Sequence, residues 1–467
     1  MTAEDLCYTP ATELRSRIAD KSLSPVELMD AVIARTEEVQ AKMNPIALPR
    51  YDQAREAARE AEAAVMRGDS LGPLHGIPIT VKDNVPTIGD RTTNGSYAFA
   101  DFVPNTEPAL VQRLKAAGAI VFAKTTTPEF AHRVLTETPL FGITRNPWSP
   151  EHTPGGSSGG ASAAVAAGCG PMAVGTDGGG SIRCPSSCAG IAGIKPTLGR
   201  VPMEFFGDAF VNYAAAGPIT RTVGDLQLML AVMSGPFTDD LHTLEVDPMP
   251  IPEAPPKGSV SGMRIAWIER FGAIPLDEEI ASLTGAAVHA MEGAGARVEA
   301  VDGLVFADAF EYYVVIATTA HAGRLTAVLE KWGDRITPSM QASIRQGATY
   351  SAADLVRAGD RRTALYRSVQ AMLHDYDLIV TPTLNAPPKT VDENGAINSP
   401  MYAEWAGYLY PFNLTSHPAA SVPVGFTASG LPVGLQVVGP WYGEPQMLSA
   451  MAWVEGAMPW RAKRPTL

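Results

Sequence analysis

Two segments of the chain combine glycine and serine in a pattern that can carry nucleophilic chemistry. Residues 153–160 read TPGGSSGG and residues 175–183 read GTDGGGSIR, and each lies beside an apolar run. Glycine tolerates the backbone conformations that let successive peptide N–H groups converge on one point. Such a turn can bind an anion, including the oxyanion that forms when an acyl carbon is attacked. Ser181, at the end of the second turn, stands where a nucleophile is needed, although a single turn of this kind is usually only a flexible loop.

Two nucleotide-binding interpretations fit these glycines poorly. A P-loop has a lysine directly after its last glycine, whereas residues 181–183 read SIR. A dinucleotide-binding motif would stand at the first strand–helix turn, with an acidic residue about 20 positions further on. No segment of the chain fits that second pattern well.

A nucleophile elbow, G-x-S-x-G, is a third alternative. Residues 156–160 match this pattern, which would make Ser158 the nucleophile. The elbow requires a strand immediately before it, but residues 146–154 contain three prolines and cannot form one. The elbow also requires a downstream histidine; His417 could serve, but its surrounding sequence is not distinctive. The elbow is therefore the weaker interpretation.

If no histidine acts as the base, Lys82 is the best candidate to activate a serine. Residues 76–84 read GIPITVKDN, so Lys82 ends an apolar, strand-like run whose side chains we expect to be buried. Burial disfavours a cation, so the pKa of a buried lysine falls and its neutral amine can act as a general base. The alternative is that Lys82 forms an ion pair with Asp83 at the end of a strand. The two serine turns need a base, which favours the catalytic role.

Taken together, these motifs resemble those of the amidase signature family. Lys82, Ser157 and Ser181 also stand at the separations that the family shows. The resemblance runs from about residue 10 to residue 455 and is only general over 240–370. The matching segments are 76–83 (GIPITVKD), 155–160 (GGSSGG), 175–183 (GTDGGGSIR), 193–197 (GIKPT), 217–223 (GPITRTV) and 430–436 (GLPVGLQ). The resemblance implies an α/β fold with a large, mixed, twisted central β-sheet covered by helices on both faces.

The resemblance also implies the role of each residue in the site. Ser181 would be the acylating nucleophile. Ser157, which often follows a cis peptide bond in this family, would relay protons between Ser181 and Lys82. Lys82 would be the base during attack and the source of the leaving-group proton. The oxyanion hole would be formed by the backbone N–H groups of Gly178, Gly179, Gly180 and Ser181.

Some positions concern the choice of substrate or depart from the family pattern. Gly178 stands where threonine is more common, and Ala131 stands where glycine is usual and by resemblance lies near the acyl pocket. The segment 203–216 could line an entrance for an aryl or apolar substrate, or it could be an ordinary packed loop. Its aromatic residues are Phe205, Phe206, Phe210 and Tyr213. The positions that we expect to bind substrate are Ala131, Gly155, Gly156 and Phe206.

The pattern of the remaining chain agrees with a layered α/β fold, because short apolar runs alternate with helical segments. Ser24 and the proline after it predict the start of a helix, and a second helix is expected over 52–66. Further helices are expected over 107–118 and over much of 306–375. The expected strands are 77–81, 119–123, 172–175, 264–268, 296–301, 378–381, 420–426 and 432–438.

We expect a single domain over residues 1–467, since no linker separates the motif-rich region from the rest. Within it we distinguish an N-terminal helical segment (about 1–68), a catalytic core (about 71–235), a variable helical region (about 260–375), and C-terminal strands and a helix (about 376–460). A proline-rich connector covers 248–257.

The composition argues against several classes of function. The formal net charge of −13 opposes a nucleic-acid partner, which needs a basic surface. Four cysteines are too few for a disulfide framework, and no histidine pair accompanies Cys184 and Cys188 at zinc-site spacing. The weakly polar stretch 161–174 is too short to span a bilayer, and no signal peptide is evident. We therefore expect a cytoplasmic enzyme without metal, cofactor, nucleic-acid or membrane partner; homodimers are common in the family.

The expected function is hydrolysis of the C–N bond of a small aryl or apolar amide by a stand-alone enzyme, with carbamates and esters as related substrates. One alternative is the amidase component of a glutamine-dependent tRNA amidotransferase complex. The segment 214–216 reads AAA, where that component should have a stretch that contains serine or aspartate. Another alternative is a non-catalytic binding protein, which the joint presence of Lys82, Ser157 and Ser181 opposes.

Overall fold

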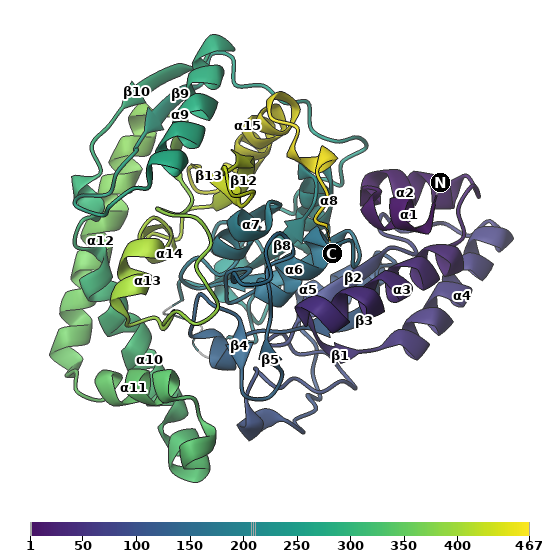
Figure 1. The fold of residues 1–467 in the computed structure, drawn as a ribbon, viewed down its shortest axis with the longest axis horizontal. Helices are drawn as coiled ribbons and strands as arrows, with labels where there is room; N and C mark the ends of the chain where they lie inside the picture. Colours follow the sequence, from purple (N-terminus) through teal and green to yellow (C-terminus); the bar gives the residue numbers. More distant parts are fainter. Residues whose placement is uncertain (1, 207, 209, 211, 467) are drawn as a thin grey trace.

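The computed structural model describes residues 2–206, 208, 210 and 212–466, and Figure 1 shows helices arranged around one large central sheet. Within the described residues this sheet has eleven strands. In spatial order they are β1 (Ile46–Pro49), β3 (Ile120–Thr125), β2 (Pro78–Lys82), β6 (Met172–Asp177), β8 (Ala215–Thr220), β7 (Ala192–Lys195), β12 (Ala419–Phe426), β13 (Pro432–Val438), β11 (Leu378–Pro382), β9 (Arg264–Trp267) and β10 (Arg297–Ala300). A separate two-stranded ribbon joins β4 (Glu137–Thr138) and β5 (Gly142–Ile143).

The sheet is mixed, as the resemblance implied. Strand β2 runs parallel to both β3 and β6, and β9 runs parallel to β10 and β11, whereas the other neighbours are antiparallel. Every residue of β2, β3, β6, β7 and β8 is buried. Successive side chains of a strand point to opposite faces, so both faces of the central strands are covered. This confirms the predicted fold class.

Helices pack against many strands of the sheet. The N-terminal helices lie at the end of the sheet near β1, and α10 to α12 lie toward the other end (Figure 1). Helices α6 and α7 pack together against the central strands, while α8 packs against α5 and α15. The helices are α1 (Ala3–Tyr8), α2 (Ala11–Ala19), α3 (Pro25–Met43), α4 (Tyr51–Arg67), α5 (Ala109–Ala116), α6 (Gly159–Ala166), α7 (Arg183–Ala189), α8 (Val223–Met233), α9 (Glu278–Gly293), α10 (Ala309–Trp332), α11 (Pro338–Gly347), α12 (Ala352–Asp375), α13 (Pro400–Trp405), α14 (Tyr410–Leu414) and α15 (Glu444–Ala457).

Local sequence signals account for several of these elements. The Ser24 hydroxyl accepts hydrogen bonds from the N–H groups of Val26 and Glu27, which caps α3 as predicted. All eight strands that the sequence predicted are present within a few residues of their expected bounds. The predicted helical region 306–375 is divided among α10, α11 and α12. Pro338 stands in the first turn of α11, where its missing N–H costs no hydrogen bond.

Three strands of the sheet, β1, β7 and β8, were not predicted from the sequence. Strand β8 lies in the middle of the sheet between β6 and β7 and contains Pro218, which pairs with Val174. Proline cannot donate to a strand ladder and normally argues against a central strand. The short β7 lies between glycine- and proline-containing segments that predict loops.

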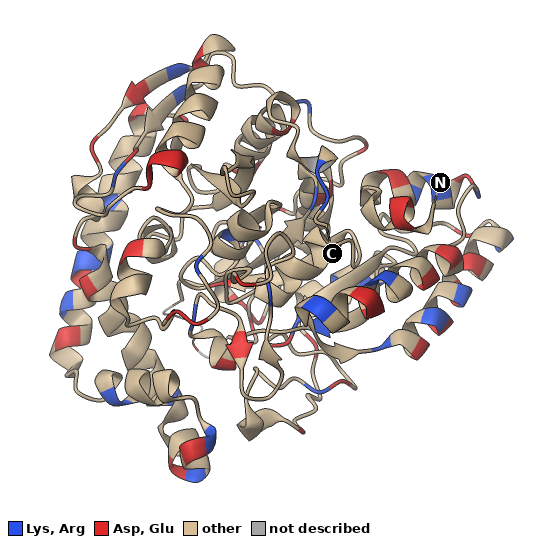
Figure 2. Ribbon diagram, in the orientation of Figure 1, with Lys and Arg blue, Asp and Glu red and all other residues tan. Residues whose placement is uncertain are grey.

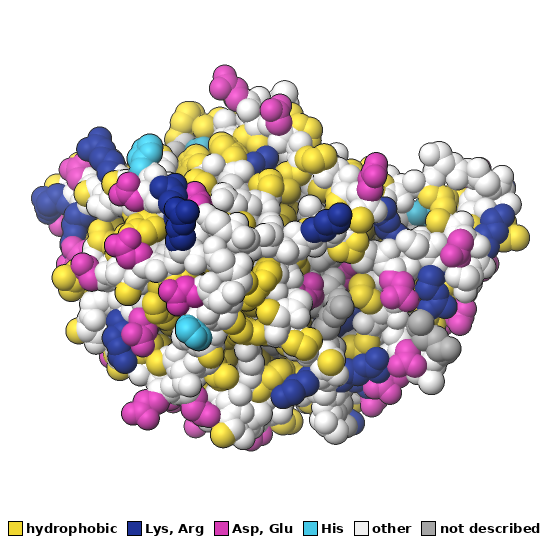
Figure 3. All heavy atoms as spheres, turned by 90° about the horizontal axis from the view of Figure 1, so that it is seen from above, with side chains coloured by type: hydrophobic (Ala, Val, Ile, Leu, Met, Phe, Trp, Pro, Cys, Tyr) yellow, Lys and Arg dark blue, Asp and Glu magenta, His cyan; other side chains and the backbone are white. Residues whose placement is uncertain are grey.

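Charged residues lie mainly on the outer elements. In the ribbon of Figure 2, acidic and basic residues are interspersed along helices such as α4 and α12. On the face drawn in Figure 3, Lys and Arg are scattered among acidic and apolar side chains rather than gathered in one patch. Among the described residues, no helix is both long and apolar enough to cross a membrane, and no cluster of His, Cys, Asp and Glu is suited to hold a metal ion.

Candidate active site

The site forms where the parallel strands β2 and β6 end side by side. Val81 pairs with Val174, and the strands end soon afterwards, at Lys82 and Asp177. The carboxyl ends of neighbouring parallel strands meet at one edge of a sheet, where ligands commonly bind. This register places the Lys82 side chain beside Thr176.

Lys82 Nζ lies within hydrogen-bond distance of three oxygen atoms. The distances are 2.7 Å to Ser157 Oγ, 2.9 Å to Thr176 Oγ1 and 3.5 Å to the Thr176 carbonyl. The Thr176 hydroxyl also accepts from Asn84 Nδ2 at 3.0 Å. No role for Thr176 or Asn84 was predicted from the sequence, although each lies in or next to a recognised motif.

The amine of Lys82 is set up to lose its proton near neutral pH. Its side chain is fully buried, and burial lowers its pKa from 10.5 to about 7, with the charge of Asp177 opposing part of this shift. Asp83 does not pair with Lys82. Its carboxylate lies 3.3 Å from Lys124 Nζ and accepts hydrogen bonds from the backbone N–H and hydroxyl of Thr93. The alternative of a Lys82–Asp83 ion pair is therefore wrong.

Ser157 comes from the loop that leads into α6, and the peptide bond between Gly156 and Ser157 is cis. Ser157 is buried and forms part of the wall of the cavity described below. Neither Gly155 nor Gly156 lines that cavity, so their expected contact with substrate is not found. Gly155 has a φ of +77°, and a Cβ on it would collide with Pro185. These glycines allow the loop to pack closely behind Ser157.

Ser181 and the glycine loop before it follow directly from β6. Gly178, Gly179 and Ser181 line the cavity. The N–H of Gly180 instead donates to Asp177 Oδ1 at 2.7 Å, so its single hydrogen is directed away from the cavity. The prediction that Gly180 contributes to an oxyanion hole is therefore wrong, and the N–H groups of Gly178, Gly179 and Ser181 remain as candidates.

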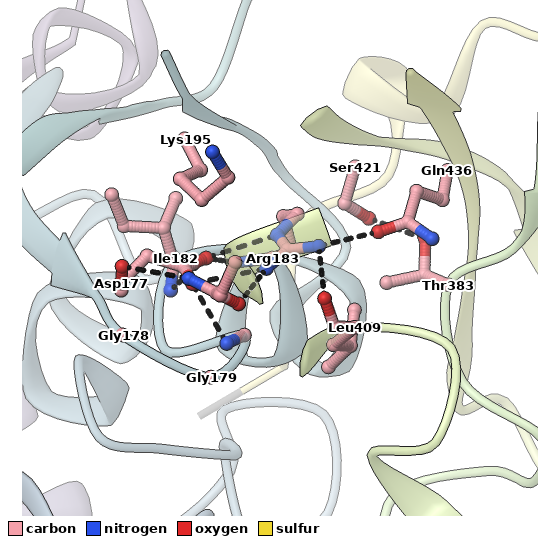
Figure 4. A network of polar contacts seen from close by, with 12 residues as sticks. Asp177, Gly178, Gly179, Ile182, Arg183, Lys195, Thr383, Leu409, Ser421 and Gln436 are labelled. Carbon is pink, nitrogen blue, oxygen red and sulfur yellow. Dashed lines mark hydrogen bonds and ion pairs between the residues drawn. The ribbon is translucent and has the colours of Figure 1, made fainter. Parts of the chain in front are cut away.

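A buried ion pair fixes the shape of this loop (Figure 4). Asp177 accepts from Arg183 Nε and Nη2, both at 3.0 Å, and from the N–H groups of Gly180 and Ile182. Asn413 Nδ2 donates to Asp177 at 2.8 Å. Burial alone would raise the pKa of Asp177, but Arg183 and Asn413 outweigh burial and hold it below its ordinary value. The loop therefore turns around a permanent carboxylate.

Arg183 connects the loop to the C-terminal part of the chain. Its Nη1 donates to the Leu409 carbonyl at 2.9 Å and to Gln436 Oε1 at 2.8 Å, and its Nη2 donates to Asn413 Oδ1 at 2.6 Å. Every nitrogen of this fully buried guanidinium thus has an acceptor, as a buried charge requires.

Two tyrosines hold the carbonyls of the same loop. Tyr402 Oη donates to the Gly179 carbonyl at 2.9 Å, and Tyr313 Oη lies 3.3 Å from the Gly178 carbonyl as a donor. The two hydroxyls lie 3.1 Å apart, and the rings stack with an interplanar angle of 4°. Fixing a carbonyl fixes the N–H of the following residue, because the peptide unit is planar. Neither tyrosine, one from α10 and one from α13, was predicted from the sequence.

The nucleophile elbow is not formed. Ser158 is fully buried, and its hydroxyl donates to the Thr176 carbonyl at 3.2 Å. No strand precedes it. Both ring nitrogens of His417 lack a hydrogen-bond partner in the described part of the chain, and the ring stacks on Tyr366. Ser158 therefore has no histidine to activate it.

A cavity of about 290 Å³ opens onto Ser157 and Ser181. Ala131 and Phe206 line it, as expected for substrate-binding positions, and Ala131 adopts a φ of +58°. Phe210 does not line the cavity and is 83% exposed. The aromatic residues of the lining are Phe130, Phe205, Phe206, Tyr213, Tyr313 and Tyr402.

Comparison with known proteins gives the family. The Amidase family model matches residues 27–448. The chain belongs to the amidase family. It is 34% identical to an acylamidase of Rhodococcus erythropolis, over 100% of this chain and 98% of the relative. It is also 35% identical to one of the subunits of the glutamyl-tRNA(Gln) amidotransferase of Synechococcus sp. (strain CC9605), over 97% of this chain and 96% of the relative.

Solved structures of the family share the fold of this amidase chain. A bacterial aryl acylamidase of the amidase signature family superimposes with a TM-score of 0.91 at 29% identity, over 98% of this chain and 99% of the other. A 6-aminohexanoate cyclic dimer hydrolase, complexed with substrate, gives a TM-score of 0.87 at 28% identity, over 98% and 99% of the two chains. These findings confirm the resemblance to amidase signature enzymes and place the chain among hydrolases that act on amides.

The titration of Lys82 predicts how stability depends on pH. Between pH 7 and 10.5 the folded amine is neutral while the unfolded amine holds a proton, so the unfolded state binds more protons and wild-type stability rises with pH. Lys82→Met removes the contribution of Lys82 to this dependence, whereas the buried Lys195, whose pKa is also lowered to about 7, keeps its own contribution in both proteins. At pH 7 we expect the free energy of unfolding of the variant to exceed that of wild type. This difference should shrink by about 1.4 kcal/mol per pH unit up to about pH 9.5. Denaturant unfolding at each pH measures this difference; a constant difference would show that Lys82 is charged in the folded protein.

The Tyr402 hydroxyl is expected to support turnover by holding the Gly179 carbonyl and with it the Gly180 N–H, whose hydrogen bond to Asp177 shapes the loop that carries Ser181. Tyr402→Phe removes one hydrogen bond, so we expect kcat to fall about fivefold to tenfold, with little change in KM. Tyr410→Phe is the matched control, because that ring joins the same stack but its hydroxyl donates to the Ala403 carbonyl. Equal losses of kcat in the two variants would contradict a specific role for Tyr402.

Proposed function

We propose that this chain is a stand-alone hydrolase of acyl amides that forms an acyl-enzyme on Ser181. The observation that carries the proposal is the 2.7 Å hydrogen bond between Lys82 Nζ and Ser157 Oγ in a buried site. Lys82 takes part in no ion pair among the described residues, so no carboxylate within contact distance holds its proton. A neutral amine beside a serine hydroxyl is a competent base.

The proposed reaction begins with attack on the amide carbon. Ser181 Oγ attacks as Ser157 accepts its proton and passes its own proton to Lys82 Nζ. The negative charge on the carbonyl oxygen is stabilised by the N–H groups of the loop 178–181. Gly180 is excluded because its N–H donates to Asp177 instead. The proton then returns through Ser157 to the leaving nitrogen, and the C–N bond breaks. Water attacks the acyl-enzyme by the same route and releases the acid.

The cavity and the relatives indicate which amides to expect. Six aromatic side chains line the cavity, and aromatic walls favour flat, apolar groups. The similarity to an acylamidase and to an aryl acylamidase supports aryl amides as substrates. Carbamates and esters carry a similar acyl carbon and are further candidate substrates.

A second candidate function is favoured by one finding, the 35% identity to a subunit of a glutamyl-tRNA(Gln) amidotransferase. In that case the chain would release ammonia from glutamine inside a complex. Ala214, which lines the cavity, belongs to the stretch where a serine or aspartate was expected for such a function. We therefore place this function second.

Assay of the purified chain alone separates the two candidates. We expect turnover of an anilide without any partner protein, and turnover of glutamine to be slower or absent. Ser181→Ala should reduce anilide turnover by at least a thousandfold, whereas Ser158→Ala should retain a functional nucleophile. Hydrolysis of glutamine alone, and only in the presence of a partner, would contradict the stand-alone enzyme. Full activity in Ser181→Ala would contradict the mechanism.

A further inference from the structure

The electrostatic character of the cavity differs from that of the whole chain. The chain carries 49 acidic and 36 basic residues, yet no Asp or Glu is among the described residues that line the cavity. Its titratable lining residues other than tyrosine are His132, Arg133, His321 and Arg324. A cavity without carboxylates in an acidic protein is suited to a ligand that is itself anionic.

Both histidines of the cavity are uncharged at neutral pH. Burial lowers the pKa of His132 to about 3 and that of His321 to about 4. Both ring nitrogens of His132 have partners, at 2.6 Å from the Glu129 carbonyl and 2.6 Å from Ser339 Oγ. His321 Nδ1 lies 2.8 Å from Ser343 Oγ. Neither histidine contributes positive charge to the cavity.

The two arginines differ in their partners. Arg133 Nη1 forms an ion pair with Glu137 at 3.0 Å, and its Nη2 donates to the Glu393 carbonyl at 3.3 Å. Arg324, on α10, forms no ion pair with any described residue, and its guanidinium lies 5.0 Å from the centre of the Phe206 ring. Arg324 is therefore the one uncompensated charge among the described residues that line the cavity.

The stacking of Arg324 on Phe206 suits it to recognise a carboxylate. A guanidinium held over an aromatic face keeps its N–H groups free at the edge, where a carboxylate can accept two parallel hydrogen bonds. Phe206 lines the same cavity as Arg324, so the aromatic ring and the guanidinium border one binding space. An apolar group and an anionic group could thus be bound together.

We infer that Arg324 is a substrate-binding residue and that the preferred substrates are aryl amides with a carboxylate distant from the scissile C–N bond. The inference rests on the proposed function, since it concerns the same cavity and the same acylation of Ser181. The carboxylate lies on either the acyl part or the amine part of the substrate, and both can be tested. The expected gain is about tenfold to a hundredfold in kcat/KM, the range of one charged hydrogen-bonded contact.

The test compares acidic and neutral substrates of similar shape. One pair is 4-acetamidobenzoate and 4-acetamidotoluene, with the carboxylate on the amine part; the other is succinanilic acid and butyranilide, with it on the acyl part. The readout is the ratio of kcat/KM for the acidic over the neutral member of each pair. In wild type we expect at least one ratio above about ten, falling as ionic strength rises because added salt screens the charge.

Variants of Arg324 should change this ratio. Arg324→Gln is expected to lower it about tenfold or more, mainly through KM of the acidic substrate, and Arg324→Lys should retain part of it. Arg335→Gln is the matched control, because Arg335 also stacks on aromatic rings, those of Tyr97 and Trp332, but does not line the cavity. That control should keep the wild-type ratio.

The outcomes distinguish the inference from the function on which it rests. If wild type hydrolyses these amides but Arg324→Gln leaves both ratios unchanged, or slows acidic and neutral substrates alike, the inference is overturned and the proposed function stands. If wild type hydrolyses none of the four amides, or if hydrolysis survives Ser181→Ala, the proposed function itself fails.

Discussion

The site depends on the removal of one ammonium group from water. Lys82 is buried at the end of β2, and its pKa falls to about 7 because the folded protein solvates its cation poorly. The neutral amine then lies 2.7 Å from Ser157 Oγ. The adjacent ends of β2 and β6 position it there, and the sheet around them supplies the burial. Burying a lysine lowers the free energy of unfolding of the whole fold, which is a common feature of active sites.

The ion pair between Asp177 and Arg183 is the second constraint, and it acts on the loop that carries Ser181. A carboxylate close to Lys82 would raise the pKa of the amine, but Asp177 is largely committed to Arg183, Asn413 and two backbone N–H groups. The pair therefore shapes the loop that carries Ser181 without holding a proton on Lys82. The tyrosines from α10 and α13 fix the opposite side of the loop through its carbonyls. The N–H edge of the loop is thus held by the neighbouring Asp177, and its carbonyl edge by tyrosines distant in sequence.

The parts that could be predicted from the sequence are those with local signals. The cap at Ser24, most strands, the burial of Lys82 and the glycine turns all follow from neighbouring residues. Tyr402 and Asn413 could not be found in this way, because their contacts with residues 177–179 join segments more than 200 positions apart. The direction of the Gly180 N–H could not be predicted from the sequence either, because it depends on the position of Asp177 in three dimensions. Strand β8 was missed because Pro218 obscures its pattern.

The central claim is that the neutral amine of Lys82 activates Ser181 through Ser157. The most direct measurement is the rate at which an alkyl fluorophosphonate labels the protein as a function of pH, with the labelled serine located by peptide mass spectrometry. We predict one adduct, on Ser181, formed at a rate that rises with pH around a midpoint of about 7 and falls by at least a hundredfold in Lys82→Met. An adduct on Ser158, or an unchanged rate and pH dependence in Lys82→Met, would contradict this account.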